Sequence, residues 1–446
     1  MQLRHYQTEA ISSWKASDYA SILEMATGTG KTVTAISGAL ELATEIQDSF
    51  RSVMILIVCP YLGLVDQWQT NFEKFGLRSL RACEGLSTWV SPLRQALDYL
   101  AQRAGSRQVV ITTNATFMTA PFQKILETTS SEIIFIADEV HNLGTRTGIA
   151  SLPKNARYRL GLSATPERHG DGPGTQGLLD YFGEISYELS LKDAIDLGCL
   201  SPYFYFPRSA KLTSDETDFY ADVTAKFAAL LRGRDFFELT PSEAERAGKL
   251  LRLRGAILGG ASAKYAPYFS DMEKLIDQKG QLIYCAEGTT PQSPDERQID
   301  FIAKEINRRG LGQSGIYDAN TARADRQRLL KAFELGSMKY LLSMRCLDEG
   351  VDIPSANVAY FLASSSNPRQ FVQRRGRVLR LHKDKEAASI YDYFSFPAAL
   401  GSGETELAEK AIAERELARV ITFAEASLNP DYAFDQIAEM RTRYGL

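Results

Sequence analysis

Two short stretches of the sequence carry residues suited to binding and cleaving a phosphate anhydride. Residues 25–32 read MATGTGKT, and residues 135–141 read FIADEVH. A phosphate loop needs glycines, so that backbone N–H groups can approach the anion, followed by a lysine and a hydroxyl where a helix begins. The first stretch supplies these residue types in this order, and the second supplies two adjacent carboxylates.

The phosphate loop is predicted just before a helical pattern that covers residues 31–46. Each residue has a predicted role in binding ATP. The turn and its backbone amides are formed by Thr27, Gly28, Thr29 and Gly30. Lys31 is predicted to contact the β and γ phosphates, and Thr32 is predicted to bind Mg²⁺. The strict pattern GxxxxGK[ST] has a glycine where this chain has Met25. The loop nevertheless follows the short apolar strand SILEM and precedes an amphipathic helix, which is the context that a phosphate loop requires.

The carboxylates of the second stretch directly follow the apolar run IIFIA. ATP hydrolysis uses one carboxylate to hold the metal and another to activate water for attack on the γ phosphate. We therefore predict Asp138 as a ligand of Mg²⁺ and Glu139 as the general base. An isolated Asp-Glu pair is ordinarily a surface turn, and His141 alone would be a structural histidine. The phosphate loop upstream in the same sheet is what favours the catalytic interpretation.

The segments that must position these residues alternate between strand and helix patterns. Short, β-branched apolar runs, typical of parallel strands covered on both faces, occur at 52–60, 108–113, 132–138 and 158–165. The same alternation restarts after residue 280, with strand candidates at 281–288, 314–319, 339–346, 357–364 and 388–396. The predicted fold class is α/β, with two doubly wound parallel-sheet domains in tandem.

We predict four regions along the chain. The first is an N-terminal ATP-binding domain at 1–200, followed by a charged helical connector or insertion at 201–278. The third is a second α/β domain at 279–400, and the fourth is a helical tail at 401–446. Within the tail, residues 404–428 form one mixed-charge helical pattern that ends near Pro430. This helix is the predicted docking surface for a partner.

The composition excludes several classes of protein. Hydrophobic residues make up 44% and charged residues 24% of the 446 residues, and no apolar run reaches the roughly 18 residues that a membrane helix needs. The 51 basic and 55 acidic residues argue against a histone-like nucleic-acid binder but are compatible with a local basic groove. The five cysteines are scattered, which argues against a disulfide framework or a zinc site. Because the N-terminal residues lack the pattern of a secretory signal, we predict a cytoplasmic location. We also predict that the protein has no membrane partner.

The ordered set MATGTGKT, ADEVH, GLSATPER, DEGVDIP and QRRGRVLR resembles the motif series of superfamily 2 helicases and translocases. By itself, the last of these motifs would be a solvated basic helix face. LRHYQTEAI, VCPYLGLVDQW and DEGVDIPSANV are similar to the group that contains the xeroderma pigmentosum B type and the motor subunits of restriction enzymes. The resemblance implies tandem RecA-like domains, ATP and Mg²⁺ as cofactors, and movement along or unwinding of DNA, with duplex DNA favoured.

The resemblance also implies roles for individual residues. In the first domain, Gln7 would read adenine and Arg4 would lie near the base. His141 would link the ATP site to the SAT segment, which consists of Ser163, Ala164 and Thr165. Those in the second domain face the γ phosphate (Gln373, Arg377 and Arg380), or lie near the ribose or the bound water (Gly350 and Asp352). An arginine from a separate domain neutralises transition-state charge only when the domains close, which couples hydrolysis to domain movement.

Predicted nucleic-acid contacts go to the backbone and are therefore tolerant of sequence. The candidates implied by the resemblance are Tyr61, Gln67, Thr113, Asn114, Arg323, Arg326, Ser343 and Arg345. A second set lies in the connector and forms either a basic face or a merely solvated one: Arg246, Lys249, Arg252 and Arg254. Trp68 follows a helical apolar pattern and is predicted to be a core residue.

Two alternatives to a DNA motor remain at this point: an RNA helicase, and a scaffold that binds nucleotide and nucleic acid without appreciable turnover. The presence of Glu139 and of the arginine pair argues against the scaffold, because these groups are needed for hydrolysis and not for binding. No nuclease, methyltransferase or zinc module is evident. In a restriction, repair or phage-defence assembly, we therefore expect other protein subunits to supply the nuclease or targeting activity.

Overall fold

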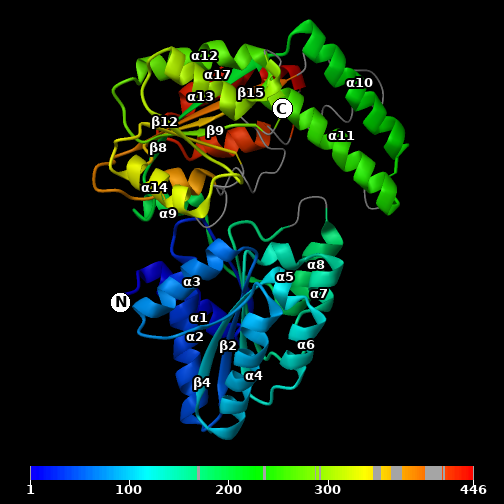
Figure 1. Cartoon of the computed structure of the whole chain (residues 1–446), viewed down its shortest axis with the longest axis vertical. Coiled ribbons are helices and arrows are strands. Elements are labelled where there is room, and N and C mark those ends of the chain that lie inside the picture. Colours follow the sequence, from blue (N-terminus) through cyan, green and yellow to red (C-terminus); the bar gives the residue numbers. More distant parts are fainter. Residues whose placement is uncertain are drawn as a thin grey trace. The chain divides into compact units, whose positions relative to one another are not determined.

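The structure, a computed structural model, describes residues 2–167, 171–234, 238–286, 288–290, 293–344, 353–362, 374–396, 414 and 417–444. These residues divide into two compact units, the first ending at Leu197 and the second beginning at Gly198 (Figure 1). Each unit is built on a parallel sheet with helices on both faces, so the predicted fold class of two tandem RecA-like α/β domains is confirmed.

The sheet of the first unit has seven strands, all parallel to their neighbours. In spatial order they are β3 (Leu80–Ala82), β4 (Arg107–Thr113), β2 (Val53–Cys59), β5 (Glu132–Asp138), β6 (Tyr158–Ser163), β1 (Ala20–Met25) and β7 (Ile185–Leu189). Every residue of β2 is buried, as expected for a strand covered on both faces. The carboxyl ends of β1 and β5 therefore lie at one edge of the same sheet.

Two groups of helices cover the sheet of the first unit (Figure 1). One face is covered by α1 (His5–Ala16), α2 (Lys31–Asp48) and α3 (Leu62–Lys74). The opposite face packs against α4 (Leu86–Gln102), α5 (Asn114–Phe117), α6 (Ala120–Glu127), α8 (Gly172–Phe182) and the short turn η1 (Val140–Leu143). Two further short helices are α7 (Arg146–Ala150) and α9 (Leu191–Asp196).

The sheet of the second unit has six parallel strands. In spatial order they are β12 (Ser314–Tyr317), β13 (Tyr340–Ser343), β9 (Gln281–Tyr284), β14 (Val358–Phe361), β15 (Ala388–Phe396) and β8 (Tyr203–Lys211). Strand β8 corrects the sequence prediction, which has a helical connector from residue 201. Its burial alternates, with Tyr203 and Tyr205 buried and Phe204 exposed, because it is an edge strand with one face on the core.

The remaining elements of the second unit are mostly helical. They are α10 (Ser214–Leu231), α11 (Pro241–Gly260), η3 (Ser262–Lys264), α12 (Tyr265–Lys274), α13 (Gln298–Arg308), α14 (Arg323–Glu334) and α17 (Pro430–Tyr444), with a small hairpin of β10 (Thr289–Thr290) and β11 (Ser293–Arg297). Helices α10 and α11 form an antiparallel pair that projects from the sheet (Figure 1). No helix in the described ranges is both long and apolar enough to span a bilayer.

The described part of the predicted docking helix is packed into the second unit. Residues 417–425 are helical, and Leu417, Val420 and Phe423 are buried. The carboxylate of Asp392 in β15 accepts hydrogen bonds from Arg419 Nη1 at 2.9 Å and Tyr205 Oη at 2.8 Å. This stretch therefore completes the unit's own core, while most of the segment before residue 417 lies outside the described residues.

Replacing Arg419 with Ala is expected to lower the free energy of unfolding of the second unit by about 3–5 kcal/mol, because the buried Asp392 carboxylate loses its cation. All three tryptophans, Trp14, Trp68 and Trp89, lie in the first unit. When urea unfolding is monitored by circular dichroism, the transition of the second unit should therefore move to a lower urea concentration. The transition monitored by tryptophan fluorescence should stay where it is. Arg328→Ala, which removes an exposed pair with Asp325, is the control and should cost under about 1 kcal/mol. Equal effects of the two variants would contradict the structural role of Arg419.

Candidate nucleotide site

The loop between β1 and α2 has the backbone conformation that its glycines predict. Gly28 and Gly30 have φ angles of 94° and 87°, in the left-handed region that other residues rarely adopt. A Cβ atom at Gly30 would lie 2.8 Å from Gln7 Nε2, so this position also needs glycine for close approach. Helix α2 begins at Lys31, and Thr32 lies in its first turn, where unpaired backbone N–H groups favour an anion.

Polar groups of the loop converge on its interior. Lys31 is buried, and its Nζ donates to the Met25 carbonyl at 2.9 Å. Thr29 Oγ1 donates to the Ala26 carbonyl at 2.7 Å. Thr27 Oγ1 is buried and, among the described residues, has no hydrogen-bond partner. Because buried hydroxyls are usually satisfied, this group fits a site whose ligand supplies oxygen acceptors, as a nucleotide does.

Helix α1 lies against the phosphate loop. Tyr6 Oη donates to the Thr29 carbonyl at 2.5 Å, and Gln7 Nε2 lies 3.5 Å from the Gly30 carbonyl. Gln7 Oε1 in turn accepts the backbone N–H of Arg4, the exposed N-cap residue of α1, at 3.0 Å. Gln7 is thus brought beside the loop and Arg4 lies next to Gln7 at the start of α1, whereas Tyr6 is a loop contact that the sequence analysis did not single out.

Asp138 ends β5 and is buried. Its Oδ1 accepts the Glu139 backbone N–H at 3.0 Å, and its Oδ2 accepts Trp68 Nε1 at 2.7 Å. Burial raises the pKa of Asp138, whereas the Trp68 hydrogen bond and the positive charge of Lys31 act to lower it. Trp68 is fully buried, as predicted for a core residue, but it also donates to a site carboxylate. The apolar spacing of α3 gave no signal of that contact.

Glu139, His141 and Ser163 form a chain of contacts. His141 Nδ1 lies 3.6 Å from Glu139 Oε2 and 3.0 Å from Ser163 Oγ, which also accepts the Thr165 backbone N–H at 3.1 Å. Asn142 Nδ2 lies 3.2 Å from His141 Nε2, which assigns the proton of a neutral ring to Nδ1. The predicted coupling residues therefore lie together, with Ala164 between Ser163 and Thr165 in the chain.

A strained backbone position carries the predicted base. Glu139 has a φ angle of 47°, which is uncommon for a residue other than glycine, and its carbonyl accepts Asn142 Nδ2 at 3.1 Å. Strain of this kind concentrates at functional sites. It directs the chain out of β5 and into η1 immediately after the metal-binding candidate Asp138.

A carboxylate that the sequence analysis missed lies just before the loop. Glu24 pairs in register with Ser163 on β6 and with Glu188 on β7. Burial, with repulsion from Glu188 and Glu167, raises the pKa of Glu24 to about 7, and the charge of Lys31 opposes this rise. The neighbouring strands that create this environment are more than 130 residues away along the chain, so no local pattern announces it.

This raised pKa predicts a pH-dependent stability. Between the ordinary pKa near 4.5 and about 7, the folded state binds more protons at Glu24 than the unfolded state, so stability falls as pH rises through that window. Glu24→Gln should therefore raise the melting temperature by a few degrees at pH 8 and by less at pH 5. Thermal unfolding at both pH values tests this, with the exposed Glu184→Gln as control. A gain at pH 5 as large as that at pH 8 would contradict the assignment.

The second unit contains a cluster of buried arginines. Arg374, Arg375 and Arg377 are between 3% and 6% exposed, so this stretch is not the solvated basic face that its composition alone would indicate. Arg374 lies over the Tyr284 ring and Arg375 over the Phe423 ring, at 5.0 and 3.5 Å from the ring centroids. Arg380 follows at the end of this stretch and is partly buried. Three other predicted site residues, Gln373, Gly350 and Asp352, lie outside the described residues.

The predicted nucleic-acid contacts differ in exposure. Tyr61 is 40% exposed at the N-cap of α3, and Gln67 is partly buried on the same helix. Thr113 and Asn114 are buried, and the Thr113 hydroxyl caps α5 by accepting the Thr116 N–H at 3.3 Å. These buried side chains have structural surroundings, and their nucleic-acid contact stays a prediction.

In the second unit, the candidates are also engaged within the fold. Ser343 is fully buried at the end of β13. The Arg326 guanidinium donates to the carbonyls of Thr321, Asp318 and Ala319 at 2.9 to 3.2 Å and so stabilises that turn. Arg323 begins α14, and Arg345 lies outside the described residues.

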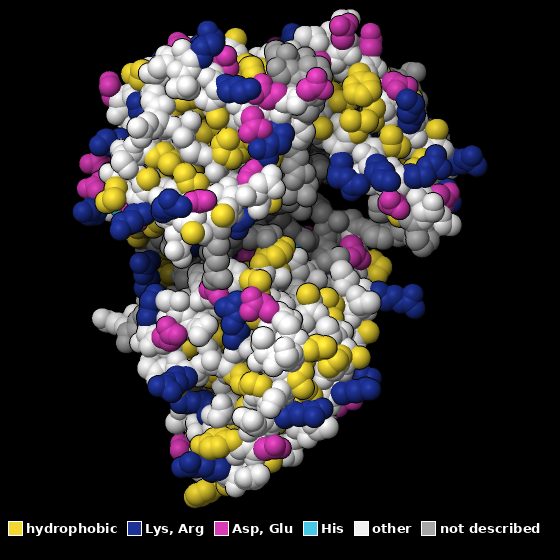
Figure 2. All heavy atoms as spheres, in the orientation of Figure 1, with side chains coloured by type: hydrophobic (Ala, Val, Ile, Leu, Met, Phe, Trp, Pro, Cys, Tyr) yellow, Lys and Arg dark blue, Asp and Glu magenta, His cyan; other side chains and the backbone are white. Residues whose placement is uncertain are grey.

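The charged face of α11 is exposed. Figure 2 shows Lys and Arg side chains gathered over the α10–α11 pair, where the exposed basic residues of α11 are Arg246, Lys249 and Arg252. Arg254 is not part of this face. It is buried, and its Nη2 donates to Tyr220 Oη at 2.7 Å.

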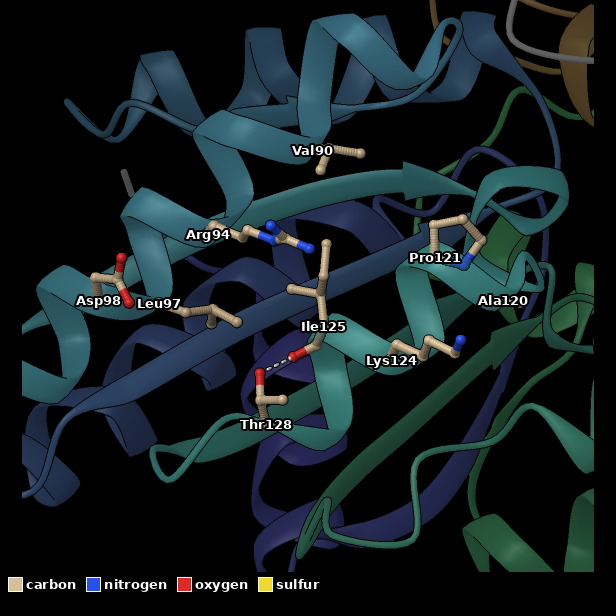
Figure 3. Close-up of a pocket in the computed structure, with 9 residues that line it drawn as sticks. All are labelled: Val90, Arg94, Leu97, Asp98, Ala120, Pro121, Lys124, Ile125 and Thr128. Carbon is tan, nitrogen blue, oxygen red and sulfur yellow. Dashed lines mark hydrogen bonds between the residues drawn. The ribbon is translucent and has the colours of Figure 1, made fainter.

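A separate groove of about 650 Å³ lies between α4 and α6 (Figure 3). Its lining is partly apolar and carries three charged groups: Val90, Arg94, Leu97, Asp98, Ala120, Pro121, Lys124, Ile125 and Thr128. None of these residues belongs to the nucleotide loop or to the carboxylate pair. The groove is therefore distinct from the candidate nucleotide site.

Two family models match the chain in succession. The model described as type III restriction enzyme, res subunit, matches residues 1–168, and the model described as helicase conserved C-terminal domain matches residues 268–382. The first covers the phosphate loop, the carboxylates and the SAT segment, and the second covers most of the second sheet and the arginine stretch. Both matches agree with the order of the motifs.

Curated relatives align along most of the chain. The DNA 3'-5' translocase XPB2 of Sulfurisphaera tokodaii is 26% identical over 87% of this chain and 81% of its own length. Putative helicase 22 of a Sulfolobus islandicus filamentous virus and the DNA 3'-5' helicase XPB of Kineococcus radiotolerans are 23% and 24% identical over 88% of this chain. The chain spans only 64% and 60% of the lengths of these two relatives.

A solved structure supports the fold. The ATP-dependent type ISP restriction-modification enzyme LlaBIII bound to DNA aligns with a TM-score of 0.61 and 15% identity, over 97% of this chain and 31% of that enzyme. With two helicase-type domain matches in the predicted order on two parallel-sheet units, the chain is an ATP-hydrolysing enzyme of helicase superfamily 2, similar to XPB translocases and helicases and, over residues 1–168, to the res subunit of type III restriction enzymes.

Proposed function

We propose that this protein is an ATP-driven DNA translocase that moves along duplex DNA. The observation that carries the proposal is the convergence of the phosphate loop, Lys31, Asp138 and Glu139 at one edge of a parallel sheet, with Lys31 close enough to influence the pKa of Asp138. The similarity to DNA translocases and helicases of the XPB type favours DNA over RNA as the track.

The residues at this edge fit ATP together with Mg²⁺. The amides of the loop and Lys31 would bind the phosphates, and the Thr32 hydroxyl and Asp138 carboxylate would hold the ion, because Mg²⁺ prefers oxygen ligands and uses few protein groups when phosphates are present. Bound Mg²⁺ would neutralise charge on the β and γ phosphates. Glu139 would take the proton of the attacking water, and Gln7 would recognise the adenine.

The remaining hydrolytic groups are assigned to the second unit. In this proposal Arg377 and Arg380 neutralise charge that develops on the γ phosphate, and His141 relays the state of the ATP site to Ser163. Tyr61, Gln67 and the basic face of α11 would contact the DNA backbone. The involvement of partner subunits with nuclease or targeting activity stays a prediction.

The test is the ATPase rate without polymer and with single-stranded DNA, duplex DNA or RNA, at one stated salt concentration, because salt weakens binding to phosphates steeply. Duplex DNA should give the largest stimulation. Displacement of a third DNA strand from a triplex then tests movement along the duplex directly. A chain that hydrolyses ATP but leaves the triplex intact is not a translocase.

The other outcomes identify the alternatives. Stimulation by RNA alone would replace the proposal with an RNA helicase. ATP binding with no turnover in the presence of any polymer would favour the nucleotide-switched scaffold. Either result overturns the DNA-translocase proposal.

A further inference from the structure

One hydrogen bond joins the metal-binding carboxylate candidate to a helix outside the nucleotide loop. Trp68 lies on α3, and its Nε1 donates to Asp138 Oδ2 at 2.7 Å. The topology explains this contact, because β2 pairs with β5 in the register Val58 to Ala137, and α3 begins three residues after β2 ends. The helix therefore starts beside the strand that terminates at Asp138.

The two oxygens of Asp138 are oriented by different parts of the fold. Oδ1 accepts the backbone N–H of Glu139, which belongs to the same strand end, at 3.0 Å. Oδ2 depends on α3 through Trp68. A hydrogen bond to a carboxylate is stronger than one between neutral groups, so loss of the indole N–H would leave the orientation of this buried group to a single donor.

Helix α3 also presents side chains to solvent. Tyr61 occupies the N-cap position of α3 and is 40% exposed, and Gln67 directly precedes Trp68. The same helix buries Val65 and Phe72, and Asp66 forms an ion pair with Arg81 on β3. Because α3 is one continuous helix of 13 residues, a displacement at its exposed first turn would be transmitted to the indole of Trp68.

We propose that Trp68 is a positioning residue that couples nucleic-acid contact at the start of α3 to the orientation of the Asp138 carboxylate. The inference rests on the proposed function for its nucleic-acid contact and on the Trp68–Asp138 hydrogen bond for its connection to the ATP site. It predicts reciprocal effects, since nucleic acid would change nucleotide affinity and nucleotide would change nucleic-acid affinity by the same factor.

The critical variant is Trp68→Phe, which keeps an aromatic ring beside Phe72 and removes only the indole donor and some volume. The sequence provides two matched controls. Trp89 is buried in α4, and its Nε1 has no hydrogen-bond partner among the described residues, whereas Trp14 Nε1 donates to the Arg159 carbonyl at 2.8 Å. Each of Trp89→Phe and Trp14→Phe replaces a buried indole outside the proposed connection.

The measurement is the affinity for duplex DNA, by fluorescence anisotropy, with and without a non-hydrolysable ATP analogue and Mg²⁺. In the parent protein we expect the analogue to change DNA affinity by about 10-fold, within the usual range of such couplings. Trp68→Phe should abolish most of this change and most of the DNA stimulation of ATPase, whereas both controls should retain them. Replacing Trp68 with β-(3-benzothienyl)alanine, which has the indole shape without the N–H, repeats the test if the Phe variant does not fold.

The outcomes separate this inference from the proposed function. If no DNA stimulates the parent protein, the proposed function fails before Trp68 is tested. If the parent responds and Trp68→Phe keeps the response of the controls, the coupling role is overturned. Equal loss of basal and DNA-stimulated turnover, with the coupling of the two affinities unchanged, also overturns it, because Trp68 would then only support the ATP site.

Discussion

Glu139→Gln is expected to bind ATP with nearly the parent affinity and to hydrolyse it about 10²- to 10⁴-fold more slowly, the range that general-base catalysis supplies. The amide keeps the length of the side chain but cannot accept a proton from water. Residue 139 would also keep its left-handed backbone and the hydrogen bond from Asn142 to its carbonyl, so the local fold should persist. Single-turnover hydrolysis and binding of a fluorescent ATP analogue measure the two effects separately.

A matched control lies at the other end of the same strand. Glu132 begins β5 and pairs with Arg51 at 2.6 Å near the surface, so Glu132→Gln makes the same chemical change away from the phosphate loop. Its turnover should remain within about twofold of the parent, since surface substitutions generally have small effects. Unchanged hydrolysis in Glu139→Gln would falsify the assignment of the base.

Lys31→Ala is expected to weaken ATP binding by about 10- to 100-fold, which corresponds to the loss of hydrogen bonds to a charged group worth about 1.5–3 kcal/mol. Turnover should fall as well, because the ammonium no longer neutralises the phosphates. The same change removes the charge that opposes the raised pKa values of Asp138 and Glu24. Calorimetric titration with a non-hydrolysable ATP analogue measures the affinity.

Lys15→Ala serves as the control for this second substitution. Lys15 on α1 forms an exposed ion pair with Glu45 at 2.7 Å, and pairs of this kind contribute little. Its ATP affinity should match that of the parent. An equally small effect of Lys31→Ala would remove the phosphate loop from the proposed site, whatever the result for Glu139.

Much of the first unit was predictable from local sequence. The run IIFIA followed by Asp138 and Glu139 predicts a buried strand that ends in two carboxylates, and β5 ends at Asp138. The loop before α2 was equally clear, because Gly28 and Gly30 occupy positions with positive φ angles. Such features depend on residue types a few positions apart, and the periodicities of strands and helices are local properties of the chain.

The second unit was less predictable where a strand comes from far away in the sequence. Strand β8 precedes the helical insertion, yet it pairs with β15, which is about 180 residues later in the chain. The helical composition of the residues that follow β8 dominated the sequence interpretation. Edge strands with one exposed face carry a weaker apolar signal than β2, which is buried throughout.

The sequence by itself was enough to predict the candidate hydrolytic groups, because phosphate binding and water activation need particular residue types at fixed spacings. Only the tertiary structure decided which partners those groups have. Trp68 and Asp138 are 70 residues apart, and His141 and Ser163 are 22 apart. The order of strands in a parallel sheet brings such residues together, and that order follows from long-range packing, which no local pattern encodes.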